Sequence, residues 1–315
     1  YTKLITDKST VLTRTDFSTA FITRNTKTLY TAREDGTTVY YFAGNATDNW
    51  VKFGKNESNQ DLFWRIIRTN SEGSVRLLYH GTSTTATDAY IGTSKFNSYA
   101  YNIGYVSYMY GSSGSIANAR ANQKNSSTIK TTIDNWYTSN LEAKGYTKYI
   151  STTAVYCNDR TYTVSGSSTF FGAYTRLISN KTPTYDCATT EDKFTVDTST
   201  GNGKLKYPIA LMTADEVSFA GGLDGNNAPI WYYSNSLLES STGNTYWWLL
   251  SPGYWSGCYA LVFGVYGSSL PGHLSYNYVT YGVRPAVSLK SCIKYSTGNG
   301  SASDPYTIKE TETGC

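Results

Sequence analysis

The chain has 315 residues and a formal net charge of +4, and only 16% of its residues are charged, whereas it contains 30 tyrosines. So many aromatic side chains exclude a disordered chain, and no apolar run approaches the roughly 20 residues that cross a bilayer. The small and scattered excess of positive charge does not indicate nucleic-acid binding. Tyrosine and serine in such numbers are typical of a recognition surface, in which rigid amphipathic rings make the contacts.

The N-terminal part of the chain predicts strands. Residues 1–28 are rich in threonine and weakly patterned, which indicates an edge strand or the end of a stalk. Two β-rich runs, residues 28–31 and 37–42, then flank Asp35-Gly36. Because Asp-Gly between such runs is a strong hairpin signal, we expect an antiparallel hairpin here.

A second hairpin is predicted over residues 63–79. Its first strand alternates apolar Trp64 and Ile66 with Arg65 and Arg68. Side chains of a strand point to opposite faces in turn, so this pattern predicts a sheet with one buried and one solvent-exposed face.

The middle of the chain predicts a long loop and two helices. Residues 81–126 are polar with scattered tyrosines, which predicts an irregular loop whose rings need a packing partner. Ser127 then caps a helix with an apolar stripe at helical spacing, and Gly145 ends it. A short helix over residues 214–220 begins at Thr213, which forms a capping box with a glutamate three residues further on.

The remaining patterns predict strands again. Residues 207–212 indicate a buried strand, and residues 246–289 predict several strands with turns at glycines. The fold class that these patterns predict is α+β, with antiparallel hairpins, two helices and long irregular loops.

The five cysteines match no zinc-binding spacing. We expect a disulfide between Cys157 and Cys187, which lie in one loop-rich stretch, and a disulfide indicates an oxidising, extracellular setting. Cys258 is a candidate partner for Cys292, and Cys315 is then left over for another chain or for further sequence.

Several motifs, occurring in one order, carry a family resemblance. They are YFAGN at 41–45, DNWVKF at 48–53, FWRIIR at 63–68, CNDR at 157–160, LKYPIALMTADEV at 205–217, and WWLLSPG and GVRPAVSLK at 247–253 and 282–290. The chain resembles the C-type-lectin-fold domains of surface proteins of Gram-positive gut bacteria and of variable proteins of diversity-generating retroelements. The resemblance implies a C-type-lectin-like ligand-binding domain over residues 29–291, followed by a C-terminal tail over residues 292–315.

We place the ligand-binding function in residues 253–281, where tyrosine and serine interleave with apolar framework residues. Framework residues are expected on one strand face and the others on the opposite, outer face. The candidate ligand-binding residues are Tyr254, Trp255, Ser256, Tyr259, Phe263, Tyr266, Ser268, His273, Ser275, Tyr276, Tyr278 and Tyr281. In retroelement variable proteins such positions are diversified by adenine-directed mutagenesis, so the resemblance makes 253–281 the candidate variable segment and Cys258 alternatively a product of that process. The other interpretation of these rings is ordinary strand tyrosines that pack between loops.

Three further residues are expected to be structural. Trp247 and Trp248 point to opposite faces if they lie in a strand, so that one of them anchors the core. Arg284 lies between apolar residues, and we expect its buried guanidinium to donate hydrogen bonds to loop carbonyls, or to Asp215 or Glu216.

Catalytic and metal-binding chemistry finds little support. His80 is expected to be an ordinary histidine at the edge of a strand, and neither an acid nor a cysteine flanks His273. Asp and Glu are absent from residues 240–303, which does not favour calcium-dependent sugar binding there. We expect no catalytic residues, no metal and no cofactor.

These observations favour an extracellular ligand-binding protein of adhesin or receptor type on a bacterial cell surface or a virion. The expected partner is a protein or glycan of another cell or host, with neither nucleic-acid binding nor direct membrane insertion. Two alternatives stay open. One is a structural stalk or pilus-type subunit, in which the aromatic rings pack against neighbours. The other is an enzyme of the formylglycine-generating type, which would need Cys258 and Cys292 to act as a pair.

Overall fold

The computed structural model describes most of the chain. Outside the described residues lie 1, 87–88, 107, 109–113, 122–125, 198, 202–204, 224–229, 233–245 and 267–268. Of residues 2–3, 119–121, 266 and 269–274, the backbone alone is described.

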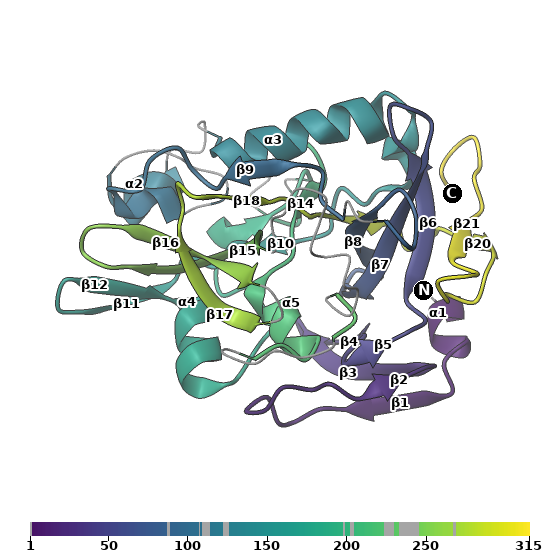
Figure 1. The fold of residues 1–315 in the computed structure, drawn as a ribbon, viewed down its shortest axis with the longest axis horizontal. Helices are drawn as coiled ribbons and strands as arrows, with labels where there is room; N and C mark the ends of the chain where they lie inside the picture. The colour runs from purple at the N-terminus through teal and green to yellow at the C-terminus, as the bar shows by residue number, and fades with distance from the viewer. Residues whose placement is uncertain are drawn as a thin grey trace.

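Two sheets make up most of the body (Figure 1). Among the described residues, the larger sheet consists of β1 (Thr10–Thr13), β3 (Thr28–Glu34), β4 (Thr37–Tyr41), β6 (Trp50–Lys55), β7 (Asp61–Thr69), β8 (Val75–Gly81), β14 (Ile209–Leu211), β19 (Pro285–Leu289), β20 (Tyr295–Thr297) and β21 (Tyr306–Ile308). Its order is β1-β3-β4-β7-β6-β21-β20, and β8, β19 and β14 continue it from β7.

The smaller sheet carries the C-terminal strands that the sequence predicted. It consists of β9 (Thr93–Lys95), β11 (Tyr162–Ser165), β12 (Ser168–Phe171), β15 (Tyr246–Trp255), β16 (Ala260–Tyr266), β17 (Ser269–Tyr276) and β18 (Thr280–Gly282). The order is β11-β12-β15-β16-β17, and β18 pairs with β15 and β9. Two short ribbons are formed by β2 (Arg24–Asn25) with β5 (Asn45–Ala46) and by β10 (Tyr156–Cys157) with β13 (Lys193–Phe194).

The helices are short. They are α1 (Thr2–Thr6), α2 (Ile116–Ala121), α3 (Thr128–Tyr137), α4 (Gly172–Tyr174) and α5 (Ala214–Phe219). Helical turns wound more tightly than an α-helix are η1 (Ile103–Val106), η3 (Tyr146–Tyr149) and η5 (Thr190–Asp192), and turns wound more widely are η2 (Thr138–Glu142) and η4 (Thr175–Asn180). Within the described part of the chain, no helix has the length and apolar character that a membrane crossing requires. This mixture of strands and helices confirms the α+β class. The expectation of two helices is wrong, since α1, α2 and α4 are present as well, and the stretch 81–126, expected to be an irregular loop, contains β9, η1 and α2.

Both predicted helices are confirmed with their caps. The Ser127 hydroxyl accepts a hydrogen bond from the Lys130 backbone at the start of α3, and Gly145 takes a left-handed conformation after η2. At α5 the complete capping box of Thr213 and Glu216 is present. Serine and threonine caps satisfy backbone N–H groups that the first helical turn leaves without partners. Cap residues at these positions therefore predict where a helix begins.

The two predicted hairpins are confirmed as β3–β4 and β7–β8, but the expectation of a solvent-exposed arginine face is wrong. Arg65, Arg68 and Arg76 are all buried. Strand β7 is central, because it pairs with β4, β6 and β8, and both of its faces are covered. His80, expected at a strand edge, is buried against the Trp50 ring as well.

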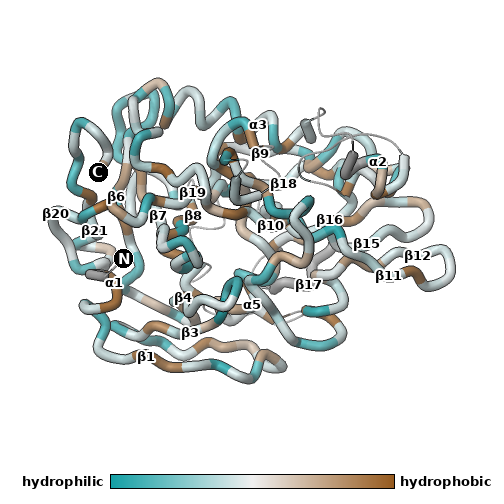
Figure 2. Tube along the Cα trace, turned by 180° about the vertical axis from the view of Figure 1, so that it is seen from behind, coloured by the Kyte–Doolittle hydropathy of each residue, from teal (hydrophilic) through white to brown (hydrophobic). Residues whose placement is uncertain are grey.

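The ends of the chain belong to the larger sheet. Strand β1 is an edge strand that pairs in parallel with β3, and in the segment 292–315 strand β21 pairs with β6. The two termini therefore lie at one end of the molecule, whereas β11, β12, β16 and β17 lie at the other end (Figures 1 and 2).

The core is rich in tryptophan, and the predicted structural residues lie in it. Trp247 and Trp248 are fully buried, as are Trp64 and Trp231. The Arg284 guanidinium is also fully buried and donates hydrogen bonds to the carbonyl of Tyr79, at 3.1 and 3.2 Å, and to that of Tyr232, at 3.0 Å. The expectation of carbonyl partners for this arginine is confirmed.

Two disulfides are present among the five cysteines. Cys157–Cys187 confirms the prediction, with the two Cα atoms 5.6 Å apart. The second joins Cys292 to Cys315, so the expectations that Cys258 pairs with Cys292 and that Cys315 is left over are wrong. Cys258 is exposed and forms no disulfide. Two disulfides fit a secreted protein.

Candidate functional site: a patch of tyrosines

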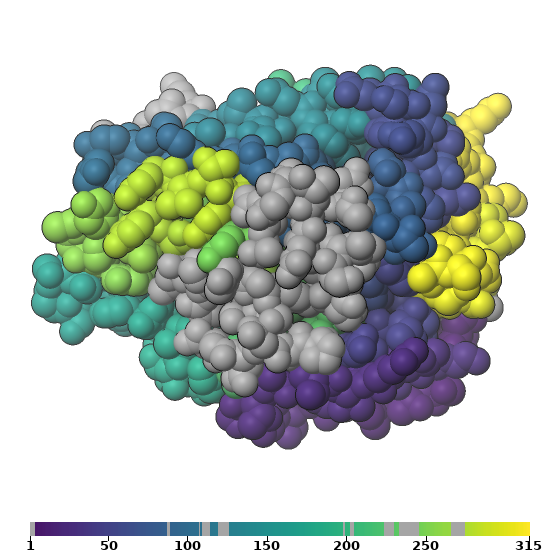
Figure 3. All heavy atoms as spheres, in the orientation of Figure 1, coloured from purple at the N-terminus to yellow at the C-terminus, as the bar shows by residue number. Residues whose placement is uncertain are grey.

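Six tyrosines gather on the surface where the segment before η1 meets the ends of β16 and β17. This tyrosine patch consists of Tyr99, Tyr101, Tyr105, Tyr259, Tyr276 and Tyr278. Four of its rings are among the most exposed large side chains, at 48% for Tyr99, 57% for Tyr101, 42% for Tyr276 and 36% for Tyr278. In the space-filling view, β16 and β17 (green to lime) border the blue segment around β9 and η1 (Figure 3).

The rings of the tyrosine patch form one continuous series. Tyr105, Tyr99 and Tyr101 follow one another with centroid distances of 5.2 and 5.3 Å, and the Tyr101 ring lies 5.2 Å from that of Tyr259. Tyr259 lies 5.0 Å from Tyr276, which stacks on Tyr278 at 5.7 Å. Contacts of this kind stabilise by about 0.5–1.5 kcal/mol each beyond the buried area, so the rings hold one another in place.

A buried asparagine ties the two segments of the tyrosine patch together. The Asn277 amide donates hydrogen bonds to the carbonyls of Tyr99, at 3.1 Å, and Tyr105, at 2.7 Å. The backbone carbonyl of Asn277 accepts a hydrogen bond from the backbone N–H of Asn97, whose side-chain amide also donates to the carbonyl of Tyr105. Asn277 is fully buried, so these bonds are shielded from water and fix the loop of residues 97–105 against the β17 end.

The turn between β15 and β16 positions Tyr259. The Ser256 hydroxyl accepts a hydrogen bond from the Tyr259 backbone at 3.0 Å, and the Ser256 backbone donates to the Tyr259 carbonyl at 3.1 Å. Ser256 therefore acts on the tyrosine patch by shaping this turn, and not as a member of it.

The tyrosine patch presents phenol hydroxyls at the edges of apolar rings. The nearby Tyr101 hydroxyl, more than burial, raises the pKa of Tyr259 above its usual range. A tyrosine hydroxyl can both donate and accept a hydrogen bond. Such a surface can bury apolar area and satisfy polar atoms of a ligand together.

Tyr254 and Trp255 are half-buried, and Trp255 packs against the same small core cluster as Tyr105 of the tyrosine patch. The Tyr254 ring stacks on Phe170 at 5.7 Å and also contacts Tyr174. Trp255 packs against a small core cluster that contains Phe171 and Ala260. Each of the two rings therefore packs in part against other residues of the chain.

Phe263, Ser275 and Tyr281 do not form an outer face, which corrects the expectation for them. Phe263 is fully buried in the main core, because β16 is central in its sheet and its residues point into packed layers on both sides. Ser275 is buried and shares a 2.7 Å hydrogen bond with the Tyr281 hydroxyl. The half-buried Tyr281 ring packs on Trp248 at 4.6 Å.

Three other candidate residues fall where the structure gives no side chain. Ser268 lies outside the described residues. Tyr266 and His273 are described through their backbones, which pair across β16 and β17.

Half of the tyrosine patch was missed by sequence reasoning. Tyr99, Tyr101 and Tyr105 fall in the stretch predicted as an irregular loop, and a need for packing partners was the one signal they carried. Their neighbours are more than 150 residues further along the chain, since the Asn277 contact to Tyr105 spans 172 positions. No local pattern reports a contact of that kind.

Comparisons of the chain with models of protein families, with curated proteins and with solved structures found no match. Among the described residues, no three side chains of His, Cys, Asp or Glu lie together as a metal site would require.

Proposed function

We propose that the chain is an extracellular ligand-binding protein of adhesin or receptor type, and that the tyrosine patch contacts its ligand. The proposal depends on the continuous series of six rings, four of them well exposed, which joins the ends of β16 and β17 to a loop that Asn277 fixes. Exposed aromatic clusters without charge are the usual composition of binding hot spots. Because the rings are held before a ligand arrives, binding costs less conformational entropy.

The expected ligand is a protein or glycan of another cell. Tyrosine rings bury large areas at a small entropic cost, and their hydroxyls can pair with the polar atoms of a peptide or a sugar. The two disulfides support the extracellular setting of this proposal.

The test is a screen of the purified chain on a glycan array and on an array of bacterial and host surface proteins. Replacing Tyr259, Tyr276 and Tyr278 together by Ala is expected to weaken binding of the strongest ligand at least tenfold, because each hot-spot ring contributes about 2 kcal/mol or more. The variant should lose some stability with the three ring contacts but should still fold, as circular dichroism would show, since these rings lie outside the main core.

The matched control is Tyr162→Ala. Tyr162 is as exposed as the tyrosine patch, at 49%, but lies on the β11–β12 hairpin. It should leave binding unchanged. Absence of binding on both arrays, or equal binding by the triple variant, contradicts the proposal.

We further propose that the domain is C-type-lectin-like and that residues 253–281 are diversified by a retroelement. The resemblance of the motifs supports both statements, and the α+β architecture agrees with the first. The test of diversification is the neighbouring DNA. A reverse-transcriptase gene with a near-copy of these codons, differing at adenines, is expected, and a locus without such a template contradicts it.

A further inference from the structure

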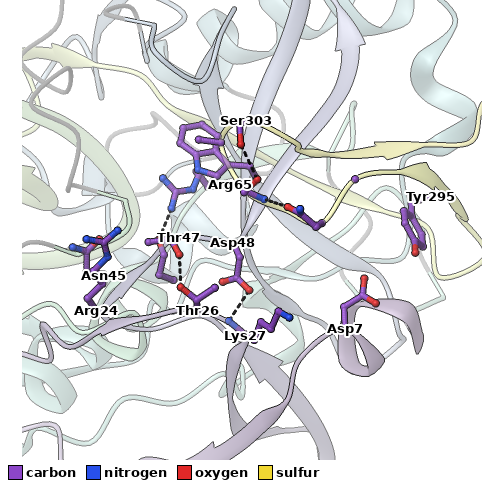
Figure 4. Close-up of a pocket in the computed structure, with 16 residues that line it drawn as sticks. Asp7, Arg24, Thr26, Lys27, Asn45, Thr47, Asp48, Arg65, Tyr295 and Ser303 are labelled. Carbon is purple, nitrogen blue, oxygen red and sulfur yellow. Dashed lines mark hydrogen bonds between the residues drawn. The ribbon is translucent and has the colours of Figure 1, made fainter.

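A cavity of about 850 Å³ lies far from the tyrosine patch, between the β2–β5 ribbon, the start of β6 and the loop after β20 (Figure 4). Its polar lining includes Thr26, Asn45, Thr47, Asn299, Ser301 and Ser303. A cavity of this size accommodates a small molecule such as one or a few sugar units.

The cavity is also lined by Arg65, a buried guanidinium without an acidic partner. Its side chain is 2% exposed, and it donates to the side-chain oxygen of Asn49 at 2.7 Å and to the carbonyl of Ala46 at 2.9 Å. One face lies 4.1 Å from the centre of the Trp50 ring. No carboxylate of the described residues forms an ion pair with it, in contrast to Arg68 and Arg76 in the same hairpin.

A buried cation of this kind favours a bound anion. Removing a charge from water costs several kcal/mol, and hydrogen bonds to neutral acceptors offset only part of that cost. Burial, together with the charge of Arg284, lowers the pKa of Arg65 to about 9, although the negative charge of Asp48 acts in the opposite direction. An anion in the cavity would offset both effects.

The other charged groups that line the cavity add to this preference. Arg24 and Lys27 are exposed at its rim. Of the two acidic residues there, Asp48 is already paired with the buried Lys8 and accepts a hydrogen bond from the Lys27 backbone. The lining thus carries three cationic side chains, those of Arg24, Lys27 and Arg65, against the two carboxylates of Asp7 and Asp48.

We propose that this cavity binds an acidic sugar, a saccharide that carries a carboxylate. Arg65 and the rim cations Arg24 and Lys27 recognise the carboxylate, because guanidinium groups form strong, directional bonds with it. The hydroxyl and amide side chains of the lining pair with the sugar hydroxyls. This site is independent of the tyrosine patch and does not rest on the proposed function.

The experiment is calorimetric titration of the chain at low salt with trigalacturonate, with its neutral counterpart trigalactose and with sodium sulfate. Trigalacturonate should bind, and its affinity should fall with added salt. Trigalactose should bind at least tenfold more weakly, and sulfate alone should not reproduce the affinity. The double variant Arg24→Gln/Lys27→Gln should lose at least tenfold in affinity for trigalacturonate, and Arg65→Gln should lose more.

Two controls keep the result interpretable. Arg33→Gln removes an exposed cation outside the cavity and should leave binding unchanged, as should the triple tyrosine variant. Where Arg65→Gln fails to fold by circular dichroism, the rim variant decides alone, because Arg24 and Lys27 are exposed. The proposal is overturned if trigalacturonate does not bind, if trigalactose binds equally well, if sulfate alone matches its affinity, or if the rim variant binds as the unmodified chain does.

Discussion

At the scale of single residues, the core contains a group of charged side chains that are buried and paired with one another. Glu216 accepts hydrogen bonds from Arg68, at 2.9 Å, and from Arg76, at 2.7 Å, while Arg68 also pairs with Glu34 at 2.8 Å. All four side chains are buried. The capping box identified Glu216 as a helix-cap residue in the sequence, but its partners Arg68 on β7 and Arg76 on β8 are 148 and 140 positions away. The local pattern therefore predicted solvent-exposed arginines where the fold pairs them.

Replacing Glu216 by Gln should destabilise the protein by about 3–5 kcal/mol, because it leaves two buried arginines short of negative charge. Urea unfolding followed by fluorescence measures this. As a control, Lys55→Gln breaks the surface pair with Asp61 and should leave the unfolding midpoint where it was. An equal effect of the two substitutions would contradict the role assigned to the buried pairs.

The same carboxylates make stability depend on pH. Burial alone would raise the pKa of Glu216 and of Glu34, but the charges of Arg76 and Arg68 outweigh it and lower both pKa values below the ordinary value near 4.5. A lowered folded-state pKa contributes stability that is present above about pH 4.5 and is lost as the pH falls below it. The free energy of unfolding should thus decline as the pH falls below about 4.5. The decline should be smaller in Glu216→Gln, and an identical decline in that variant would refute this origin.

At the scale of elements, what could be predicted was local. Asp-Gly predicted a hairpin, and caps such as Ser127 and Thr213 predicted helices, because a few neighbouring residues decide these conformations. The parallel pairings β1–β3 and β6–β21 could not be predicted, since they join segments that no turn connects. The Cys292–Cys315 disulfide, next to β20 and β21, was missed for the same reason.

Removing the Cys157–Cys187 disulfide by a double substitution to Ala should lower stability by about 3–4 kcal/mol, given the 30-residue separation that it closes. Denaturant unfolding of the unmodified chain and of the double variant measures the difference in the free energy of unfolding. Cys258→Ser, which removes no disulfide, should be neutral. A loss below about 1 kcal/mol would mean that the loop is held by its other contacts.

At the scale of the whole molecule, the tyrosine patch joins two segments that the sequence keeps far apart. Tyr259, Tyr276 and Tyr278 could be nominated from composition, whereas Phe263 was misplaced because period-two alternation fails in a strand covered on both faces. Strand β16 is such a strand, with β15 and β17 as its neighbours. The exposed rings therefore lie at the strand ends and on the facing loop.

Tyrosine nitration followed by mass spectrometry, with and without the strongest ligand from the arrays, measures whether the tyrosine patch is exposed in the free protein and covered by the ligand. Free protein should nitrate readily at Tyr101, Tyr276 and Tyr278, and slowly at the buried Tyr137. Bound ligand should protect the first three and leave the rate at Tyr162 unchanged. Nitration of Tyr276 and Tyr278 as slow as that of Tyr137, or protection that falls on Tyr162 instead, would contradict the account.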